Sequence, residues 1–368
     1  MSGPGGGTPW SGAGRLTVAL VVVLVVLTAA SGAVWARVLG GRATDPGQAG
    51  AGPVASTSAP SPAPSAPASS APSSPDTSAD PEADLPRSDR PLPADQIVWR
   101  HNLGVDWTMS TISAEGTRGS VVLASGKQEI SPVVSHDRRT ILYLRRERPG
   151  ERTSLHAVAA DGSVQRLLFR DGSPSCPYLR QAAWSVDGTL GLVCRTDQQG
   201  ETYTLSTARL DGTPLRTLDV GPIGSPTFSP DGRRILYPKA SSGSYQRGGP
   251  LYVTEVDGST EPTEVVGGRN LGPAWAPSGT TIAFAREDDG TAHVVTMPVD
   301  GTKDDLDVLT DADRDDIDPS WSPDGRSLVF RRGSEEDDYR LMVMTRTGHD
   351  ERELSDDGTV GTPSWTPR

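Results

Sequence analysis

The sequence has little positive charge, few aromatic residues and almost no cysteine. Of its 368 residues, 35 are Lys or Arg and 47 are Asp or Glu, which gives a formal net charge of −12 at pH 7. Proteins that bind nucleic acid displace phosphate counterions with a basic surface, so this charge argues against a nucleic-acid partner. Aromatic residues make up 5% of the chain. Five of the eight Trp nevertheless lie in repeated strands, namely Trp99, Trp184, Trp275, Trp321 and Trp365.

Motifs of common hydrolases are missing as well. No Gly-x-Ser-x-Gly segment marks a serine nucleophile. Ser135, His136 and Asp137 are the residue types of a catalytic triad, but adjacent residues cannot hydrogen-bond in series as a triad requires. The other histidines have no metal-ligand spacing. We therefore predict that the protein is not an enzyme and that it uses no cofactor.

Long apolar runs are absent except near the N-terminus. Residues 16–35 carry no charge and are long enough for a helix to cross a hydrocarbon core of ~30 Å. They follow a Gly-rich segment, 1–15, which we expect to be disordered in the cytoplasm. The run predicts a transmembrane helix or signal-anchor. The alternative is a cleaved signal peptide, because residues 31–33 or 34–36 could serve as the cleavage site.

Residues 36–95 are rich in Ser, Pro and Ala. Such a segment buries too little apolar surface to fold, and its prolines keep it partly extended. We predict a disordered linker, either O-glycosylated or unmodified. The rest of the chain is then extracytoplasmic, either tethered to the cell membrane by a single helix or secreted after cleavage.

From residue 96 onward the chain repeats a short hairpin. Its clearest copy is Pro319 to Arg332, in which Ser322-Pro-Asp-Gly325 has the residues of a type I turn. Related turns begin at residues 135, 185, 229 and 276. The residues that occupy the position before the turn recur every 44 to 50 residues and are Val134, Trp184, Phe228, Trp275, Trp321 and Trp365. A period near 45 built from strands alone is typical of β-propeller blades with four strands each.

Counting these copies predicts an all-β fold, a six-bladed β-propeller over residues 96–368. The first blade has only three strands at its N-terminal end. Residues 362–366 could supply its missing inner strand and close the ring, so we expect a monomeric propeller closed by its C-terminal strand. The turn serines and their C-terminal counterpart are expected to give the axis a hydroxyl lining; they are Ser135, Ser185, Ser229, Ser322 and Thr366.

The motif Pro-x-Trp-Ser-Pro-Asp-Gly-x-x-Ile-x-Phe carries a family resemblance. Copies at 319–330, 273–284 and 226–237 resemble the repeat of TolB-like six-bladed β-propellers, and the resemblance covers about 270 residues. The best-known members of that family are periplasmic and bind other envelope proteins. This chain differs from TolB in having a helix and linker in place of the preceding α/β domain. That arrangement is similar to membrane-anchored envelope propellers of Gram-positive, high-GC bacteria.

Two smaller sites can be considered from the residues alone. Cys176 and Cys194, with 17 residues between them, could form a disulfide in an exported domain, and two buried thiols are the alternative. The alternating carboxylates Asp311, Asp313 and Asp315 resemble a calcium loop. The loop lacks the Gly and Glu that an EF-hand needs at its sixth and twelfth positions, so an acidic connection without metal is favoured.

The long loops of the ring predict a binding face, because functional residues often lie on loops above a rigid scaffold. The basic candidates lie in blade two, and the acidic candidates lie across the ring in blades five and six. They are Arg145, Arg146, Arg148, Arg152, Asp288, Asp289, Glu335, Glu336, Asp337 and Asp338. Ordinary solvated loops are the alternative. We therefore predict a non-catalytic protein-interaction module of the bacterial cell envelope, with envelope proteins as partners. The second hypothesis is an exported sensor or carrier that binds a small ligand or glycan in the axial funnel.

Overall fold

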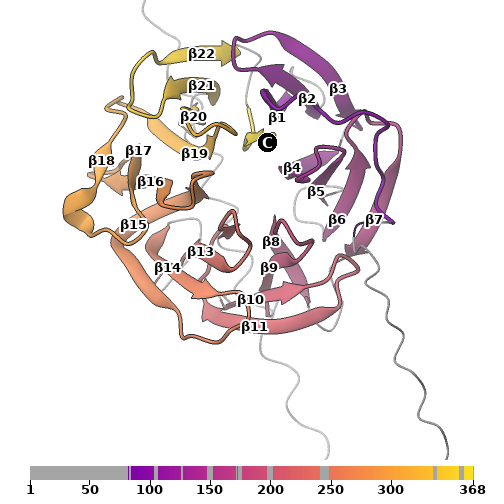
Figure 1. Ribbon diagram of the computed structural model, residues 1–368, viewed down its shortest axis with the longest axis horizontal. Helices are drawn as coiled ribbons and strands as arrows, with labels where there is room; N and C mark the ends of the chain where they lie inside the picture. The colour runs from indigo at the N-terminus through magenta and orange to yellow at the C-terminus, as the bar shows by residue number, and fades with distance from the viewer. Residues whose placement is uncertain are drawn as a thin grey trace, which may run out of the picture. The chain divides into compact units, whose positions relative to one another are not determined.

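The computed structural model describes residues 82, 84–102, 107–125, 127–146, 152–170, 172, 176–196, 202–240, 248–334, 338–355 and 360–367. Figure 1 shows its strands arranged in sheets around a central axis, so the predicted all-β propeller is confirmed. The predicted segments 1–15 and 16–35, with most of the linker, lie outside the described residues. Within the described part, no helix is long and apolar enough to cross a membrane.

Four sheets have four antiparallel strands each. The sheet at the N-terminal end contains β1 (Gln96–Asn102), β2 (Trp107–Ser113), β3 (Arg118–Ala124) and β23 (Ser364–Trp365). The next contains β4 (Gln128–Val134), β5 (Thr140–Arg146), β6 (Thr153–Ala159) and β7 (Gln165–Arg170). The third contains β8 (Tyr178–Trp184), β9 (Leu190–Arg195), β10 (Tyr203–Ala208) and β11 (Pro214–Gly221). The last contains β19 (Asp315–Trp321), β20 (Ser327–Gly333), β21 (Arg340–Thr345) and β22 (Arg352–Ser355).

The fifth sheet has seven strands, and it corrects the expectation of six separate sheets. It contains β12 (Thr227–Phe228), β13 (Arg234–Pro238), β14 (Gly249–Glu255), β15 (Thr263–Trp275), β16 (Thr281–Asp288), β17 (Thr291–Pro298) and β18 (Asp307–Val308). A short 3₁₀ helix, η2 (Lys303–Asp305), precedes β18. The long strand β15 pairs with β14 near its start and with β16 near its end. The outer strand of the fourth repeat therefore continues directly into the inner strand of the fifth.

Side-chain contacts keep β15 unbroken. Asn270 is fully buried, and its Nδ2 donates hydrogen bonds to Gly249 O at 3.1 Å and to Gly267 O at 3.3 Å. Arg286 Nη1 also donates to Gly267 O, at 3.0 Å. Gly268 has φ of 102°, a backbone conformation that glycine adopts without steric cost. These bonds give the connection between the two repeats the partners that an ordinary loop would find in water.

The hairpin turns form as the sequence predicts. In Ser229-Pro-Asp-Gly232, Gly232 has φ of 71° and donates its N–H to Ser229 O at 2.9 Å. Ser229 Oγ donates to Asp231 Oδ1 at 2.6 Å, which fixes the turn from within. The turn of the second sheet has Arg138 in place of the glycine, with φ of 61°. A non-glycine residue pays a steric cost in this conformation.

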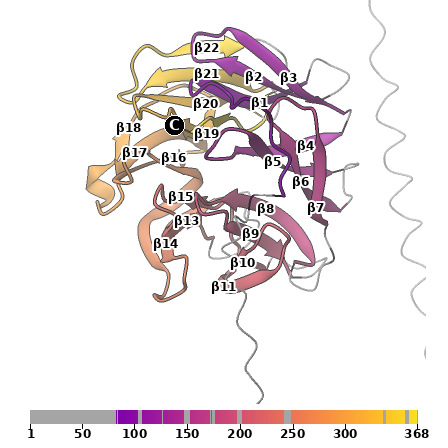
Figure 2. The same cartoon turned by 45° about the vertical axis from the view of Figure 1, so that its right-hand side comes forward.

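The segment before β1 compensates for that turn (Figure 2). Residues 84–92, assigned above to the linker, lie against the second sheet. Ser88 N and Leu92 N donate to the carbonyls of Arg139 and Arg138, and Thr140 Oγ1 donates to Pro86 O at 2.7 Å. The Leu85 side chain is buried in the core shared by the second and third sheets. The linker therefore ends earlier than predicted, and we call residues 84–92 the strap.

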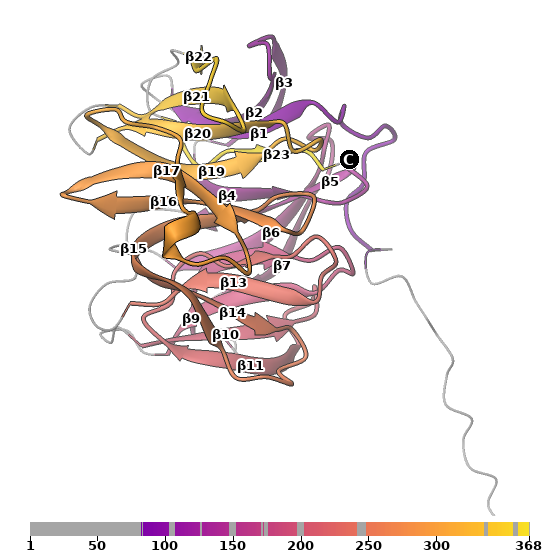
Figure 3. The same ribbon diagram turned by 60° about the vertical axis from the view of Figure 1, so that its left-hand side comes forward.

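The C-terminal strand closes the ring, as predicted (Figure 3). Trp365 pairs with Ile97 and Ser364 with Val98 in an antiparallel register. Thr366 N adds a hydrogen bond to Gln96 O at 2.9 Å. The cluster around Trp365 also contains Val329 and Leu341 of the last sheet, so apolar side chains fill the space between the first and last sheets. Four other core clusters are likewise shared between neighbouring sheets, and a fifth lies within the seven-stranded sheet, between its fourth and fifth repeats.

Candidate functional site

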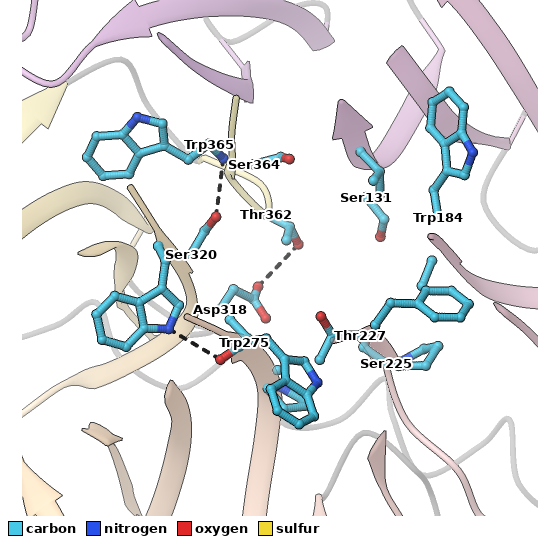
Figure 4. Close-up of a pocket in the computed structure, with 18 of the residues that line it drawn as sticks. Ser131, Trp184, Ser225, Thr227, Trp275, Asp318, Ser320, Thr362, Ser364 and Trp365 are labelled. Carbon is cyan, nitrogen blue, oxygen red and sulfur yellow. Dashed lines mark hydrogen bonds between the residues drawn. The ribbon is translucent and has the colours of Figure 1, made fainter. Parts of the chain in front are cut away.

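The candidate site is a cavity of about 940 Å³ on the ring axis, lined by the inner segment of every repeat. We call it the axial cavity. In each repeat, one residue of the cavity lining lies three positions before the aromatic residue or valine that precedes the hairpin turn. These six ring positions are Ser131, Gln181, Ser225, Gly272, Asp318 and Thr362. In Figure 4, the labelled side chains of this set surround a common space.

Backbone irregularities turn these residues toward the axis. The pairing of the inner strand shifts register between Ile130 and Val133, and again between Ile317 and Ser320. Corresponding shifts occur at the ring positions of the third sheet and of β15. Ser131, Gly272 and Asp318 have φ of 52°, 52° and 54°. Bulges of this kind re-aim a side chain, and strained non-glycine residues tend to cluster at functional sites.

Hydrogen bonds join neighbouring inner strands around part of the cavity. Ser131 Oγ donates to Gln181 Oε1 at 3.4 Å, and Thr362 Oγ1 donates to Asp318 Oδ2 at 3.2 Å. The backbone N–H of Trp365 donates to Ser320 Oγ at 3.2 Å (Figure 4). The wall between the second and third sheets and the wall between the last and first sheets are thereby fixed.

The charged side chains in the wall of the axial cavity belong to one ion pair. Asp318 and Arg331 line the cavity, together with His136 as a further titratable residue. Arg331 Nε donates to Asp318 Oδ2 at 2.9 Å, and its Nη2 also contacts that oxygen. The guanidinium lies over the Tyr339 ring, 4.6 Å from its centroid. The pair holds β19 and β20 together at the cavity and places a carboxylate on the axis.

The expected hydroxyl lining is only partly right. Ser229 Oγ donates to Asp231, and Ser135 and Ser322 donate likewise to Asp137 and Asp324 in their own turns. These three hydroxyls donate their protons within the hairpin turns, so they stabilise the turns and are not free to donate to a ligand. Ser185, Ser229 and Thr366 do line the cavity, and further cavity hydroxyls lie earlier in their repeats, among them Ser131, Ser225 and Thr362. Most ring positions stand directly before a proline, and this x-Pro-x-Trp spacing is the signal that sequence reasoning missed.

The first two residues of the predicted basic loop, Arg145 and Arg146, belong to strand β5. Arg145 is buried, with its Nε donating to Glu129 Oε1 at 3.1 Å and its Nη2 to Tyr143 Oη at 3.0 Å. Arg145 is therefore a core residue, which corrects its assignment to a binding face. Arg146 ends β5 and is half-buried, and Arg152 is exposed. Arg148 lies outside the described residues.

The acidic candidates do not gather at one site. Asp288 and Asp289 belong to the tight turn between β16 and β17, where Asp288 accepts a hydrogen bond from Arg286 Nε at 2.9 Å. Asp289 has φ of 56° at that turn. Asp338 is exposed before β21. Glu335, Glu336 and Asp337 lie outside the described residues.

The calcium candidate is not supported. No three His, Cys, Asp or Glu side chains in the described part of the chain are grouped so that they could hold a metal ion. Asp315 lies in β19, and its Oδ1 accepts the N–H of Ala292 at 2.9 Å. Asp313 and Asp311 precede the strand without joining it. The Asp315 carboxylate thus connects β19 of the last sheet to β17 of the seven-stranded sheet.

The two cysteines form a disulfide, as the sequence allows. Cys176 and Cys194 are bonded, with their Cα atoms 5.2 Å apart. The bond joins the segment before β8 to the end of β9, next to the buried Leu179. It covers the same core into which Leu85 of the strap inserts. This part of the ring therefore has both a covalent and an apolar reinforcement.

Comparison with known proteins places the fold in a family. Residues 97–368 match the model of the TolB beta propeller domain. The chain belongs to the TolB β-propeller family. The structure of TolB from Acinetobacter baumannii is similar, with a TM-score of 0.62, 20% identity, and coverage of 74% of this chain and 67% of that one. A TolB-type protein of Agrobacterium tumefaciens gives a TM-score of 0.54 and 19% identity, covering 74% and 99%. At these identities the likeness concerns the fold.

Two curated relatives match shorter stretches of the chain. An uncharacterized protein of Agrobacterium fabrum is 27% identical over 195 residues, which cover 50% of this chain and 64% of the relative. An uncharacterized peptidase of Bacillus subtilis, YuxL, is 32% identical over 112 residues, 29% of this chain and 17% of the peptidase. The chain thus spans less than two thirds of either relative.

Proposed function

We propose that the protein is a membrane-tethered, extracytoplasmic interaction module that binds envelope proteins without catalysing a reaction. In this proposal the seven-stranded sheet counts as two blades, so the TolB-type ring has six. Residues 16–35 would anchor it, and the ring would act as a monomer. The observation that carries the proposal is the axial cavity, where six inner segments direct side chains into one space.

The cavity suits recognition because its frame is rigid and its lining is varied. Closure by β23 and the shared cores hold the inner strands in place. Five different residue types occupy the six ring positions, so the repeat architecture does not dictate one residue there. Preorganised groups on a rigid scaffold reduce the entropy lost on binding. A contact surface at the axis therefore has the features that a specific interaction needs.

A site-specific crosslinking experiment tests this function. A photoreactive residue replaces Thr362 in the cavity or, as the control, Leu167 on the outer strand β7. We expect the cavity position to give a discrete protein adduct in envelope fractions and the outer position to give none. Adducts from the outer position alone, or from neither, would contradict the proposal.

The second candidate is a sensor or carrier for a small ligand or glycan. The size of the cavity favours it, since about 940 Å³ lies within the range of roughly 300–1,000 Å³ typical of small-molecule sites. A glycan array probed with the purified propeller would show binding under this alternative. Array binding that Thr362 substitution removes, without any protein adduct, would replace the first proposal with this one.

A further inference from the structure

Asp318 uses only one of its two carboxylate oxygens inside the protein. Oδ2 accepts hydrogen bonds from Arg331 Nε, Arg331 Nη2 and Thr362 Oγ1. Oδ1 accepts none from the residues that the structure describes. A carboxylate has about four lone-pair sites and is stabilised when they are filled. The free oxygen therefore offers an acceptor to whatever enters the axial cavity.

The neighbouring cation does not compete for the same role. Two nitrogens of Arg331 are directed at Asp318, and Nη1 donates to Val360 O at 3.2 Å. Its side chain is 16% exposed and packs over Tyr339. The guanidinium is thus occupied from three directions. Within this ion pair the carboxylate keeps an unused oxygen while each guanidinium nitrogen already donates a hydrogen bond, so a cationic group suits this wall of the cavity better than an anionic one.

The space beside the free oxygen is kept open by a glycine. A Cβ on Gly272 would lie 2.9 Å from Asp318 Oδ1. The φ of 52° at Gly272 also disfavours any other residue. In all five of the other repeats, the residue at this ring position carries a side chain. The gap in the lining therefore lies directly in front of the unused carboxylate oxygen.

Unpartnered hydroxyls complete the set of acceptors. Ser225, Thr227 and Ser364 line the cavity, and their hydroxyls make no hydrogen bond to another described residue. An ammonium group has three donors and no acceptor, so one carboxylate oxygen and hydroxyl oxygens match it. Charge-assisted hydrogen bonds are roughly twice as strong as neutral ones. The net charge of −12 also attracts cations over a distance.

We propose that the axial cavity binds a primary ammonium group, with Asp318 Oδ1 as its main acceptor and Thr227 Oγ as a second. The inference rests on the proposed function, because it names the chemistry by which the cavity would recognise a partner. The ammonium would be a lysine side chain of a partner protein or a free aliphatic amine. Both present the same group to the cavity.

Calorimetric titration of the purified protein distinguishes these sources. The probes are acetyl-Gly-Lys-Gly-amide, the same peptide with an acetylated lysine, and 1,5-diaminopentane. We expect the lysine peptide to bind and its acetylated form not to bind. Binding of diaminopentane alone would identify a free amine as the ligand of the same site. Equal binding of the acetylated peptide, or no binding of either amine, would overturn the proposal.

Matched variants connect binding to the named atoms. Asp318→Asn should weaken amine binding about tenfold or more, since it removes a charged hydrogen bond. Asn tolerates the positive φ of this position, which favours retention of the fold. Asp304→Asn removes the same charge from an exposed position and should leave affinity unchanged. Thr227→Val should weaken binding about threefold to tenfold, by losing a neutral hydrogen bond.

The outcomes separate this inference from the proposed function. If Asp318→Asn and Thr227→Val both bind the amine like the unchanged protein, the ammonium site is wrong. Protein adducts at Thr362 would then still support an interaction module. If no adduct forms while amine binding depends on Asp318, the ammonium site stands and the protein-interaction proposal fails.

Discussion

Single residues in this ring divide into those that fix turns, those that join strands and those that face the axis. Asp231 belongs to the first group, Arg145 to the second and Asp318 to the third. All three are charged residues, and their roles depend on where in the repeat they lie and on which strand lies opposite. Asp231 finds its partner two residues away, whereas Arg145 finds Glu129 through strand pairing.

The turn aspartates should make stability depend on acid. The Ser229 hydroxyl and then the Arg233 N–H hold the pKa of Asp231 below its usual range. Hydrogen bonds from the residue two positions on lower the pKa of Asp161, Asp211 and Asp257 as well. A lowered pKa in the folded state contributes stability that is present above the unfolded pKa and lost as pH falls through the folded value.

We therefore expect the melting temperature to fall as pH drops below about 4, the ordinary range of Asp. Carboxyl NMR titration should show Asp231 ionising at a pH below the ordinary range of Asp. Asp231→Asn should flatten the decline in melting temperature between about pH 4 and pH 2. An unchanged acid profile in that variant would refute the assignment.

The buried pair of Arg145 and Glu129 should be essential to the second sheet. Arg145→Met should lower the free energy of unfolding by about 3–5 kcal/mol, because Glu129 then remains buried without its cation. Arg152→Met, at an exposed position, should change it by less than about 0.5 kcal/mol. Urea titration measures both values. Equal small effects would return Arg145 to the surface assignment made from sequence.

Elements of the fold were predictable from sequence when the interactions that form them join residues close in the chain, and less so when those interactions join distant strands. Hairpins follow from turn residues within five positions, so the strands around Ser229 and Ser322 could be placed from sequence. The continuous β15 could not, because it depends on cross-strand bonds from Asn270 to Gly249 and from Arg286 to Gly267. The axial cavity could be predicted in position, but its lining was missed. A proline follows Ser131 and Asp318 in the sequence, but the bulge that re-aims each side chain depends on pairing with the neighbouring strand.

The strap is the element whose removal should tell most about the second sheet. Leu85→Ala should lower the free energy of unfolding by about 2–5 kcal/mol, as for other large-to-small core changes. The control is Asp89→Ala, because only the backbone carbonyl of Asp89 accepts a hydrogen bond from Arg139. Limited proteolysis should show cleavage before β1 in the Leu85 variant alone. Cleavage of the unchanged protein at the same site and rate would show that the strap is not docked.

At the scale of the whole molecule, ring closure is a long-range contact. β23 and β1 are neighbours in the sheet but lie at opposite ends of the domain's sequence. Their pairing therefore forms only when the intervening sheets are in place. Apolar residues of β1 lose their cover if it fails, among them Ile97 and Trp99. Closure should therefore determine the cooperativity of unfolding, as well as its midpoint.

Truncation tests this directly. A chain of residues 1–361 lacks β23 and should melt at lower temperature, with a broader transition than the unchanged protein. Trp365→Ala should cost about 3–5 kcal/mol by leaving a cavity between the first and last sheets. A chain of residues 1–367 serves as the control and should behave like the full length. Unchanged melting of the 1–361 chain would contradict closure by this strand.

The unbroken strand β15 also limits how the ring can be rearranged. In a circular permutant the natural ends are joined and new ends are opened elsewhere. New ends between Val266 and Asn270 would interrupt pairing with both β14 and β16, so two repeats would lose their common strand at once. New ends at the exposed turn of Asp161 and Gly162 would leave every strand whole. The fourth and fifth repeats thus share a strand, and we expect the chain to tolerate new ends there less well than in the turns between separate strands.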